Sequence, residues 1–231
     1  MGVQTIVHLL RHCEVHNPGG VLYGRMDGFH LSDLGNQMAQ RIAETIGDRD
    51  IVHLRSSPLE RAQETLAPLA ARLAMTPQID PRVIESGNKF QGVNFSDGAK
   101  TFLKRPGLLR HMYNPFTPSW GEPYKDVVAR MWPAVLDARA VAEGHEAVAV
   151  SHQLPIWVTR LKAEGRRFLH DPRKRHCTLC SLTSFTFEDE RLVSVGYSEP
   201  AGDLIPVADR NAPFSAGGAD DDTLPSSGPP S

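Results

Sequence analysis

Residues 5–14 read TIVHLLRHCE, an apolar run that is followed at once by four polar or reactive side chains. The β-branched and apolar residues Thr5–Leu10 are typical of a buried strand. Arg11, His12, Cys13 and Glu14 then place a cation, an imidazole, a thiol and a carboxylate where this strand ends. The same order occurs twice more, because strand candidates at Asp50–Leu54 and Ala147–Ser151 are followed by RSSPLERA (55–62) and HQ (152–153).

Segments with helical patterns alternate with these strands. Ser32 is a suitable N-cap for a helix that Gly47 ends, with Leu34, Met38 and Ile42 on one face. We also expect a helix with Pro58 in its first turn, a helix over Glu122–Ala142 kinked at Pro133, an apolar helix around Ile156–Leu161, and a terminal hairpin of Ser181–Phe187 and Leu192–Tyr197. This alternation predicts an α/β fold, a three-layer sandwich with a mainly parallel sheet flanked by helices.

The composition of the 231-residue chain argues against several classes of partner. Lys and Arg number 25 against 27 Asp and Glu, and this near-neutral balance is not that of a nucleic-acid binder. No apolar stretch approaches the roughly 18 residues that a membrane-spanning helix requires. We therefore expect neither nucleic acid nor a membrane as a partner.

The domain boundary and the compartment follow from the ends of the chain and from its cysteines. Gly, Pro, Ser and Asp make up 13 of the 17 residues in Ser215–Ser231. Such a segment buries too little apolar surface to offset its ordering entropy, so we expect one domain over 1–214 and a disordered C-terminal tail over 215–231. The N-terminus lacks a basic leader, and three cysteines are too few for a disulfide framework. These features favour a reducing cytoplasm.

The cations and imidazoles at the strand ends indicate the chemistry of the ligand. In an open parallel sheet, ligands bind beyond the carboxyl ends of the strands, so these groups should converge on one cationic crevice. Its natural ligand is a small anion, and the fork geometry of arginine favours phosphate, although a carboxylate also fits. Glu85 precedes a flexible loop and is either an acid presented to this crevice or a solvated surface carboxylate.

Five motifs in order resemble the histidine phosphatase superfamily, also called phosphoglycerate mutase-like. They are LLRHCEVHN (9–17), YGRMDGFHLSDLGNQMA (23–39), SSPLERAQET (56–65), Glu85 with FQG (90–92), and GE (121–122) with VSH (150–152). The resemblance runs from about Val7 to the Leu192–Tyr197 strand, which is nearly all of the predicted domain.

The resemblance implies a covalent mechanism on a phosphate monoester. His12 would attack phosphorus and hold a phosphohistidine, for which it must be neutral. Arg11, Arg61 and His152 would bind the equatorial oxygens and stabilise the transition state, and Asn17 would add a neutral donor.

Glu85 would protonate the leaving oxygen and then activate the water that releases phosphate. Arg25 either binds substrate or forms an ordinary surface ion pair. Because the positive pocket neutralises charge that other phosphotransferases assign to Mg²⁺, the resemblance implies neither a metal nor another cofactor. The expected partner is a small-molecule phosphoester, and the protein is expected to be a monomer or a homodimer.

Two residues depart from the family pattern. Cys13 and Gln153 stand where the family usually has glycine. Beside two cations Cys13 could be an oxidation-sensitive thiol, but we favour an inert side chain turned toward the core. Cys177 and Cys180 form a lone Cys-x-x-Cys, and we favour two small apolar residues over a zinc or redox site because no second ligand pair exists.

The function predicted from the sequence is a phosphomonoester hydrolase, with two alternatives. A phosphoglycerate mutase would carry two consecutive arginines where this chain has Arg110 and His111. A non-catalytic phosphate-binding module remains open because of the two departures from the motif. The variable region from about Phe90 to Lys125 is aromatic and basic, which favours a substrate with an apolar body and a second anionic group.

Overall fold

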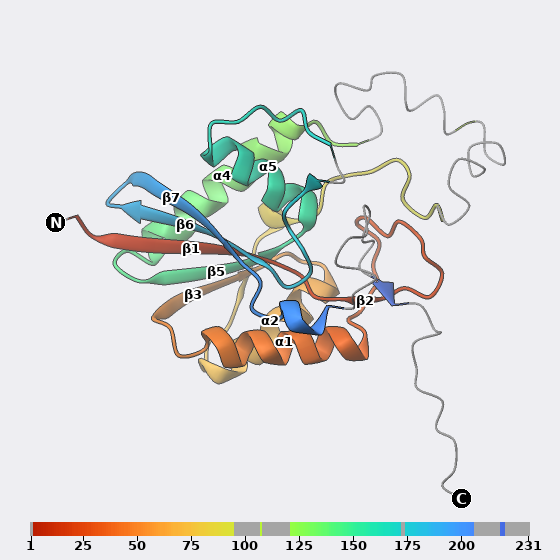
Figure 1. The fold of residues 1–231 in the computed structure, drawn as a ribbon, viewed down its shortest axis with the longest axis horizontal. Helices are drawn as coiled ribbons and strands as arrows, with labels where there is room; N and C mark the ends of the chain where they lie inside the picture. Colours follow the sequence, from red (N-terminus) through yellow and green to blue (C-terminus); the bar gives the residue numbers. More distant parts are fainter. Residues whose placement is uncertain (1, 95–106, 108–120, 172–173, 206–217, 220–231) are drawn as a thin grey trace, which may run out of the picture.

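A computed structural model describes residues 2–94, 107, 121–171, 174–205 and 218–219 of the chain. Within this part, six strands form one sheet in the order β4-β3-β5-β1-β6-β7 (Figure 1). The strands are β1 (Gln4–Arg11), β3 (Ile51–Ser56), β4 (Gln78–Ile79), β5 (Glu146–Ser151), β6 (Leu182–Glu188) and β7 (Arg191–Ser198). The first four in the sheet are parallel, and β6 and β7 add an antiparallel hairpin beside β1.

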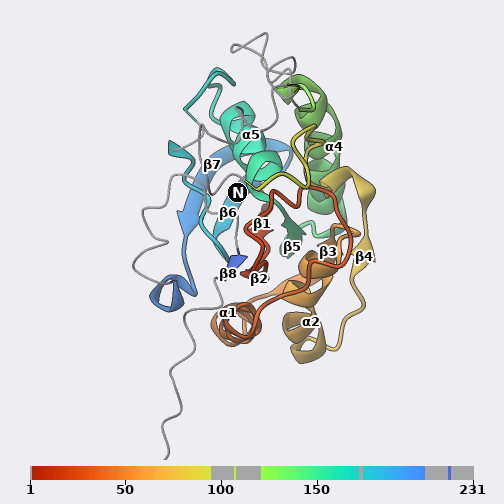
Figure 2. The same ribbon diagram turned by 90° about the vertical axis from the view of Figure 1, so that its right-hand side faces the viewer.

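Two pairs of helices cover the two faces of this sheet (Figure 2). Helices α1 (Asp33–Ile46) and α2 (Glu60–Arg72) share a core with Leu10, Leu54 and Val150. Helices α4 (Tyr124–Val141) and α5 (Gln153–Ala163) share the other core with Val7, Leu9 and Ala149. Successive strand residues point to opposite faces, so β1, β5 and β6 each supply residues to both cores. The three-layer α/β prediction is therefore confirmed.

The helix boundaries agree with the expected caps, with one correction. Ser32 caps α1, its Oγ accepting the Gly35 N–H at 2.9 Å, and Gly47 ends the helix. Pro58, however, is not in the first turn of α2, which begins at Glu60. The Ser57 N–H instead donates to the Val150 carbonyl at 3.0 Å, so the chain continues the β3–β5 ladder before it enters the helix.

Short elements complete the described chain. They are β2 (Val15–His16), β8 (Gly218–Ala219) and the 3-10 turns Pro81–Val83 and Gly202–Leu204. Gly218–Ala219, within the predicted tail, pairs in parallel with β2, a contact that the composition did not predict. The other residues of 215–231, the pair Arg110 and His111, and most of the variable region lie outside the described residues. No described helix has the length and apolar character needed to span a bilayer.

The cysteines correct two expectations. Cys13 and Cys180 form a disulfide with Cα atoms 4.8 Å apart and a sequence separation of 167, while Cys177 is a buried free thiol. Cys13 does face the core, as expected, but it is bonded there and is not a free thiol. Cys180 is likewise not simply a small apolar residue. The cysteines thus no longer support the expectation of a reducing compartment, because a disulfide is present.

Candidate active site

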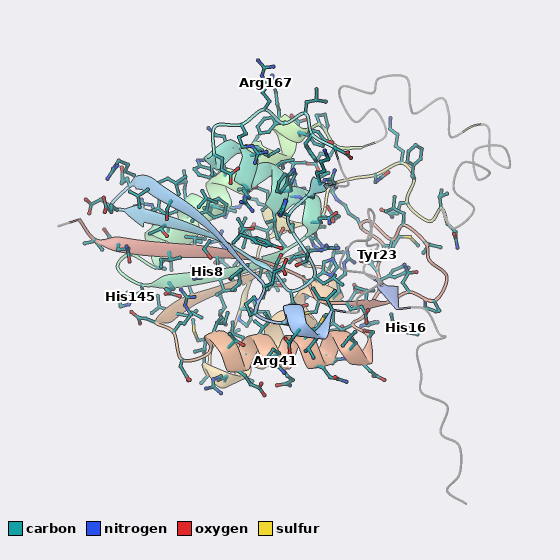
Figure 3. The ribbon with its side chains drawn as sticks, viewed as in Figure 1. His8, His16, Tyr23, Arg41, His145 and Arg167 are labelled. Carbon is teal, nitrogen blue, oxygen red and sulfur yellow. A yellow bond between two sulfur atoms is a disulfide. The ribbon has the colours of Figure 1, made fainter. Side chains whose placement is uncertain are left out.

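Three neighbouring strands deliver the candidate residues to the same edge of the sheet. Beyond β1, the His12 N–H donates to the carbonyl of Ser151, the last residue of β5, at 3.1 Å. The rings of His12 and His152 lie 5.2 Å apart between centroids. In Figure 3, Tyr23 and His16 mark this carboxyl end of the strands, whereas His8 and His145 lie toward the opposite end. The expected convergence of His12 and His152 is therefore present.

The imidazole of His12 is held in one tautomer. Its Nδ1 lies 2.8 Å from the backbone carbonyl oxygen of Cys13. A carbonyl can only accept, so Nδ1 carries the proton and Nε2 keeps its lone pair in the neutral ring. Burial first, then Arg61 and Arg11, lower the pKa of His12 well below its usual value of 6.5. His12 is thus a neutral imidazole beside two fixed positive charges.

His152 is equally buried and also neutral. Its Nε2 lies 2.8 Å from the Ser57 hydroxyl oxygen, while its Nδ1 has no partner among the described residues. Burial, followed by the charge of Arg61 and the neighbouring His12, lowers the pKa of His152 well below 6.5. Ser57, which sequence reasoning did not assign to the site, therefore fixes the orientation of this ring.

Arg61 is fully buried, yet some of its N–H groups have no acceptor among the described residues. Its Nη2 donates to the Gly24 carbonyl at 2.6 Å, and its guanidinium lies 4.7 Å from the centre of the Tyr23 ring. Its Nε and Nη1 find no acceptor in the described part of the chain. Burial lowers the pKa of Arg61, because the charged form has lost its water. Arg61 is therefore a buried cation with two N–H groups, Nε and Nη1, that have no acceptor among the described residues.

Arg11 and Arg55, near the carboxyl ends of β1 and β3, have different environments. Arg11 donates from Nη1 to the Cys177 carbonyl at 2.8 Å, and its charge acts on both His12 and His152. Arg55, by contrast, donates to Asp80 at 2.8 Å and to the Ala134 carbonyl at 2.9 Å, toward α4. Arg55 is therefore a structural group, and Arg11 and Arg61 are the cations beside the two histidines.

Glu85 lies on the loop after the Pro81–Val83 turn and is half-buried. Its Oε1 accepts the Ser86 N–H at 2.7 Å. Its charge partly offsets the lowering of the Arg61 pKa by burial, so the carboxylate lies within electrostatic range of that cation. The loop is fastened by Arg130, whose Nη1 donates to the carbonyls of Arg82 at 2.6 Å and Ile84 at 2.7 Å. This anchoring residue carries no signal in the sequence.

Arg25 and Asn17 are engaged with protein groups. Arg25 donates to the Glu85 carbonyl at 2.6 Å and to Glu122 at 2.7 Å, which favours the ion-pair alternative for this residue. The Asn17 side chain closes its own loop, donating to the Val21 carbonyl at 2.9 Å and accepting the Val21 N–H at 3.2 Å. A cavity of about 330 Å³ lies beside Glu122, lined by Arg25, Gly87, Asn88, Lys89, Gly121 and Glu122.

A neutral histidine with a free Nε2, set between buried guanidinium groups at the carboxyl edge of the sheet, agrees with the comparison with protein families. The chain belongs to the histidine phosphatase superfamily (branch 1), whose family model matches residues 7–200. The membership expected from the five motifs is thereby confirmed.

Individual proteins similar to this chain come largely from mycobacteria. "Uncharacterized protein Rv0525" of Mycobacterium tuberculosis strain H37Rv is 53% identical over 203 residues, covering 87% of this chain and 99% of that protein. "Glucosyl-3-phosphoglycerate phosphatase" of the same strain is 32% identical over 133 residues, covering 56% of this chain and 58% of the relative.

Solved structures share the fold. Mycobacterial glucosyl-3-phosphoglycerate phosphatase Rv2419c with inorganic phosphate superposes with a TM-score of 0.66 at 24% identity, covering 86% of this chain and 98% of that one. A phosphoglycerate mutase from Bacillus anthracis gives a TM-score of 0.68 at 16% identity, covering 88% and 96%. At these identities the likeness concerns the fold alone.

Proposed function

We propose that this protein is a phosphomonoester hydrolase that works through a phosphohistidine on His12 and requires no metal. The observation that carries the proposal is the His12 Nδ1–H bond to the Cys13 carbonyl, which leaves Nε2 unprotonated and available to attack. Membership of the histidine phosphatase superfamily supports the same role for this residue.

The first half-reaction transfers the phosphoryl group to the enzyme. Arg61 directs its unused Nε–H and Nη1–H at the phosphate oxygens, and Arg11 and His152 complete the cradle. His12 Nε2 then forms a bond to phosphorus while the bond to the leaving oxygen breaks. The guanidinium groups neutralise the charge on the transferring group, and Glu85 gives its proton to the leaving oxygen.

The second half-reaction returns His12 to its resting state. Glu85, now a carboxylate, takes a proton from water as the water oxygen bonds to phosphorus and the P–N bond breaks. The electron pair returns to Nε2, while Nδ1 keeps its proton and its bond to the carbonyl. The products are inorganic phosphate and a neutral histidine, so the cycle is balanced.

The substrate we propose is a small phosphate monoester with a second anionic group. The cavity beside Glu122 is about 330 Å³, and its wall carries two cations, Lys89 and Arg25, of which Arg25 is paired with Glu122. One relative is named glucosyl-3-phosphoglycerate phosphatase. A glucosyl-3-phosphoglycerate carries a carboxylate in addition to its phosphate. A panel of sugar phosphates, phosphoglycerates, nucleotides and phosphopeptides identifies the preferred class.

The decisive experiment compares His12→Ala with His145→Ala, an exposed histidine paired with Asp50 at the other end of the sheet. Wild type and His145→Ala should release phosphate from an aryl phosphate and yield an acid-labile phosphoryl adduct after rapid quenching. His12→Ala should do neither. Phosphoglycerate isomerisation without net hydrolysis would instead establish the mutase alternative, and phosphate binding without turnover would establish a binding module.

A further inference from the structure

Cys13 contacts three parts of the proposed site at once. Its carbonyl accepts the His12 Nδ1–H, and its N–H donates to the Thr65 hydroxyl at 3.0 Å. That hydroxyl donates to the Arg61 carbonyl at 2.7 Å, so Cys13 also couples to the first turn of α2. Its sulfur is bonded to Cys180. Any movement of Cys13 therefore moves the acceptor that holds His12.

The partner of Cys13 lies on the loop that holds Arg11. Cys177 offers its carbonyl to the Arg11 guanidinium at 2.8 Å, and Ser181 offers its carbonyl to the Arg11 N–H at 3.0 Å. Cys180 lies between these two acceptors, in a left-handed backbone conformation with φ of 54°. The loop thus reaches the end of β1 from the β6 side.

The disulfide links the two segments that follow and precede the paired strands β1 and β6. The pairing ends with Leu10 opposite Leu182, and one further backbone bond joins Arg11 to Ser181. Beyond that point the Cys13–Cys180 bond is the covalent link between the two segments. The carbonyl that orients His12 and the carbonyl that orients Arg11 are therefore held together by it.

We infer that the Cys13–Cys180 disulfide is a positioning element, which keeps His12 and Arg11 at the relative positions that an anion requires. Phosphate binding then depends on the redox state of this disulfide. The inference rests on the proposed function for the role of His12 and Arg11. A dithiol reductant would cleave the S–S bond to give two thiols and would itself be oxidised to a disulfide. The loop 177–181 is then tied to β1 by hydrogen bonds alone.

The test compares oxidised and dithiol-reduced protein, their states verified by the two-hydrogen difference in intact mass. Both cysteines are fully buried, which slows attack by the reductant, so the incubation is continued until the mass shift is complete. The first readout is the Kd for inorganic phosphate, which we expect to be three- to tenfold weaker after reduction. The second is solvent exchange of the His12 Nδ1 proton by NMR, which we expect to be at least tenfold faster.

Two variants separate positioning from simple stabilisation. Cys180→Gly removes the sulfur while suiting the positive φ, and it should match the reduced wild type and ignore the reductant. Cys177→Ala lacks the third thiol but keeps the disulfide, so reduction should change its phosphate affinity by the same factor as in wild type. Circular dichroism verifies that every form is folded.

The outcomes remain distinct from those that test the hydrolase. A folded, reduced protein with unchanged phosphate Kd and unchanged His12 proton exchange would overturn the positioning role, even if its melting temperature fell. If neither redox state binds phosphate, the redox dependence of binding is refuted, and the exchange rate of the His12 proton decides whether the disulfide positions His12. Redox-dependent phosphate binding in a protein that hydrolyses no phosphoester would uphold this inference and refute the proposed function.

Discussion

Two buried arginines allow a direct test of the difference between a structural and an anion-binding cation. Arg61 and Arg55 are 0% and 2% exposed. Arg55 is paired with a carboxylate, Asp80, and a backbone carbonyl, whereas Arg61 has a single described acceptor, the Gly24 carbonyl. We expect Arg61→Met to weaken anion binding at least tenfold with little change in the free energy of unfolding. We expect Arg55→Met to lower the free energy of unfolding with little change in anion binding.

The expected effect of Arg61→Met on stability combines opposing contributions. Removing a buried charge relieves its desolvation penalty, which amounts to several kcal/mol for one ion. Against this, the Gly24 carbonyl loses its donor, at a cost of about 1–3 kcal/mol, and the contact with the Tyr23 ring is lost, at about 0.5–2 kcal/mol. The net free energy of unfolding should stay within about 1 kcal/mol of wild type.

Phosphate binding by Arg61→Met should fall at least tenfold. A hydrogen bond to a charged group contributes about 1.5–3 kcal/mol, and 1.4 kcal/mol corresponds to a factor of ten in Kd. Arg61 offers two unused N–H groups, Nε and Nη1, so the loss of even one such bond exceeds this threshold.

Arg55→Met is the matched control. It removes the bonds to Asp80 and to the Ala134 carbonyl, although Arg82 continues to donate to Asp80 at 2.8 Å. We expect a loss of about 3 kcal/mol in the free energy of unfolding and a phosphate Kd within twofold of wild type.

Urea unfolding followed by circular dichroism gives the stabilities of both variants, and calorimetry with inorganic phosphate gives the affinities. If Arg61→Met lost about 3 kcal/mol while binding phosphate normally, then Arg61 would be a structural cation. The reasoning from its unused donors would then be refuted.

Three further predictions concern the two buried histidines, the packing of Gly35, and the role of Glu85. Because burial and Arg61 lower the pKa of His12 and His152, the unfolded chain binds more protons than the folded one below pH 6.5. The free energy of unfolding should therefore fall by up to about 1.4 kcal/mol per pH unit for each histidine as the pH drops from 6.5 to 5, and substituting both by Asn should flatten this slope in urea titrations. Gly35→Ala would place Cβ 2.1 Å from a backbone carbonyl oxygen and should cost about 3 kcal/mol in the free energy of unfolding, whereas Gly196→Ala, with its nearest atom at 3.8 Å, should change it by less than about 0.5 kcal/mol. Glu85→Gln removes the proposed proton donor and should slow hydrolysis of an alkyl phosphate about 100-fold but that of a nitrophenyl phosphate less than tenfold; equal slowing of both would argue against the acid role.

The elements that the sequence predicts correctly are those with local signals. Buried strands were recognisable from short apolar runs, and the Ser32 cap and Gly47 end of α1 from residue type alone. The convergence of His12 and His152 was predictable because parallel strands present their carboxyl ends at one edge. Each of these inferences needs only a window of a few residues and one topological rule.

What the sequence did not predict depends on contacts between distant segments. The Cys13–Cys180 bond spans 167 residues, and no local pattern reveals that the loop before β6 meets the end of β1. Arg130 resembles any helix-surface cation until the fold places three backbone carbonyls against it. Arg55 appeared beside the motif residues but points to the other face of the sheet, since alternate residues of a strand face opposite sides.

The way Arg130 fastens the Glu85 loop has a consequence for the diversification of such enzymes. Its guanidinium donates to the carbonyls of Arg82, Ile84 and Glu85 and to the Glu122 carboxylate, and none of these acceptors belongs to the anion cradle of Arg11, Arg61 and the two histidines. The loop that carries Glu85 and the group of Arg11, Arg61 and the two histidines are therefore held by separate sets of contacts. If the proposed function holds, the Glu85 loop can change to suit a new leaving alcohol while the proposed phosphate-binding residues stay the same.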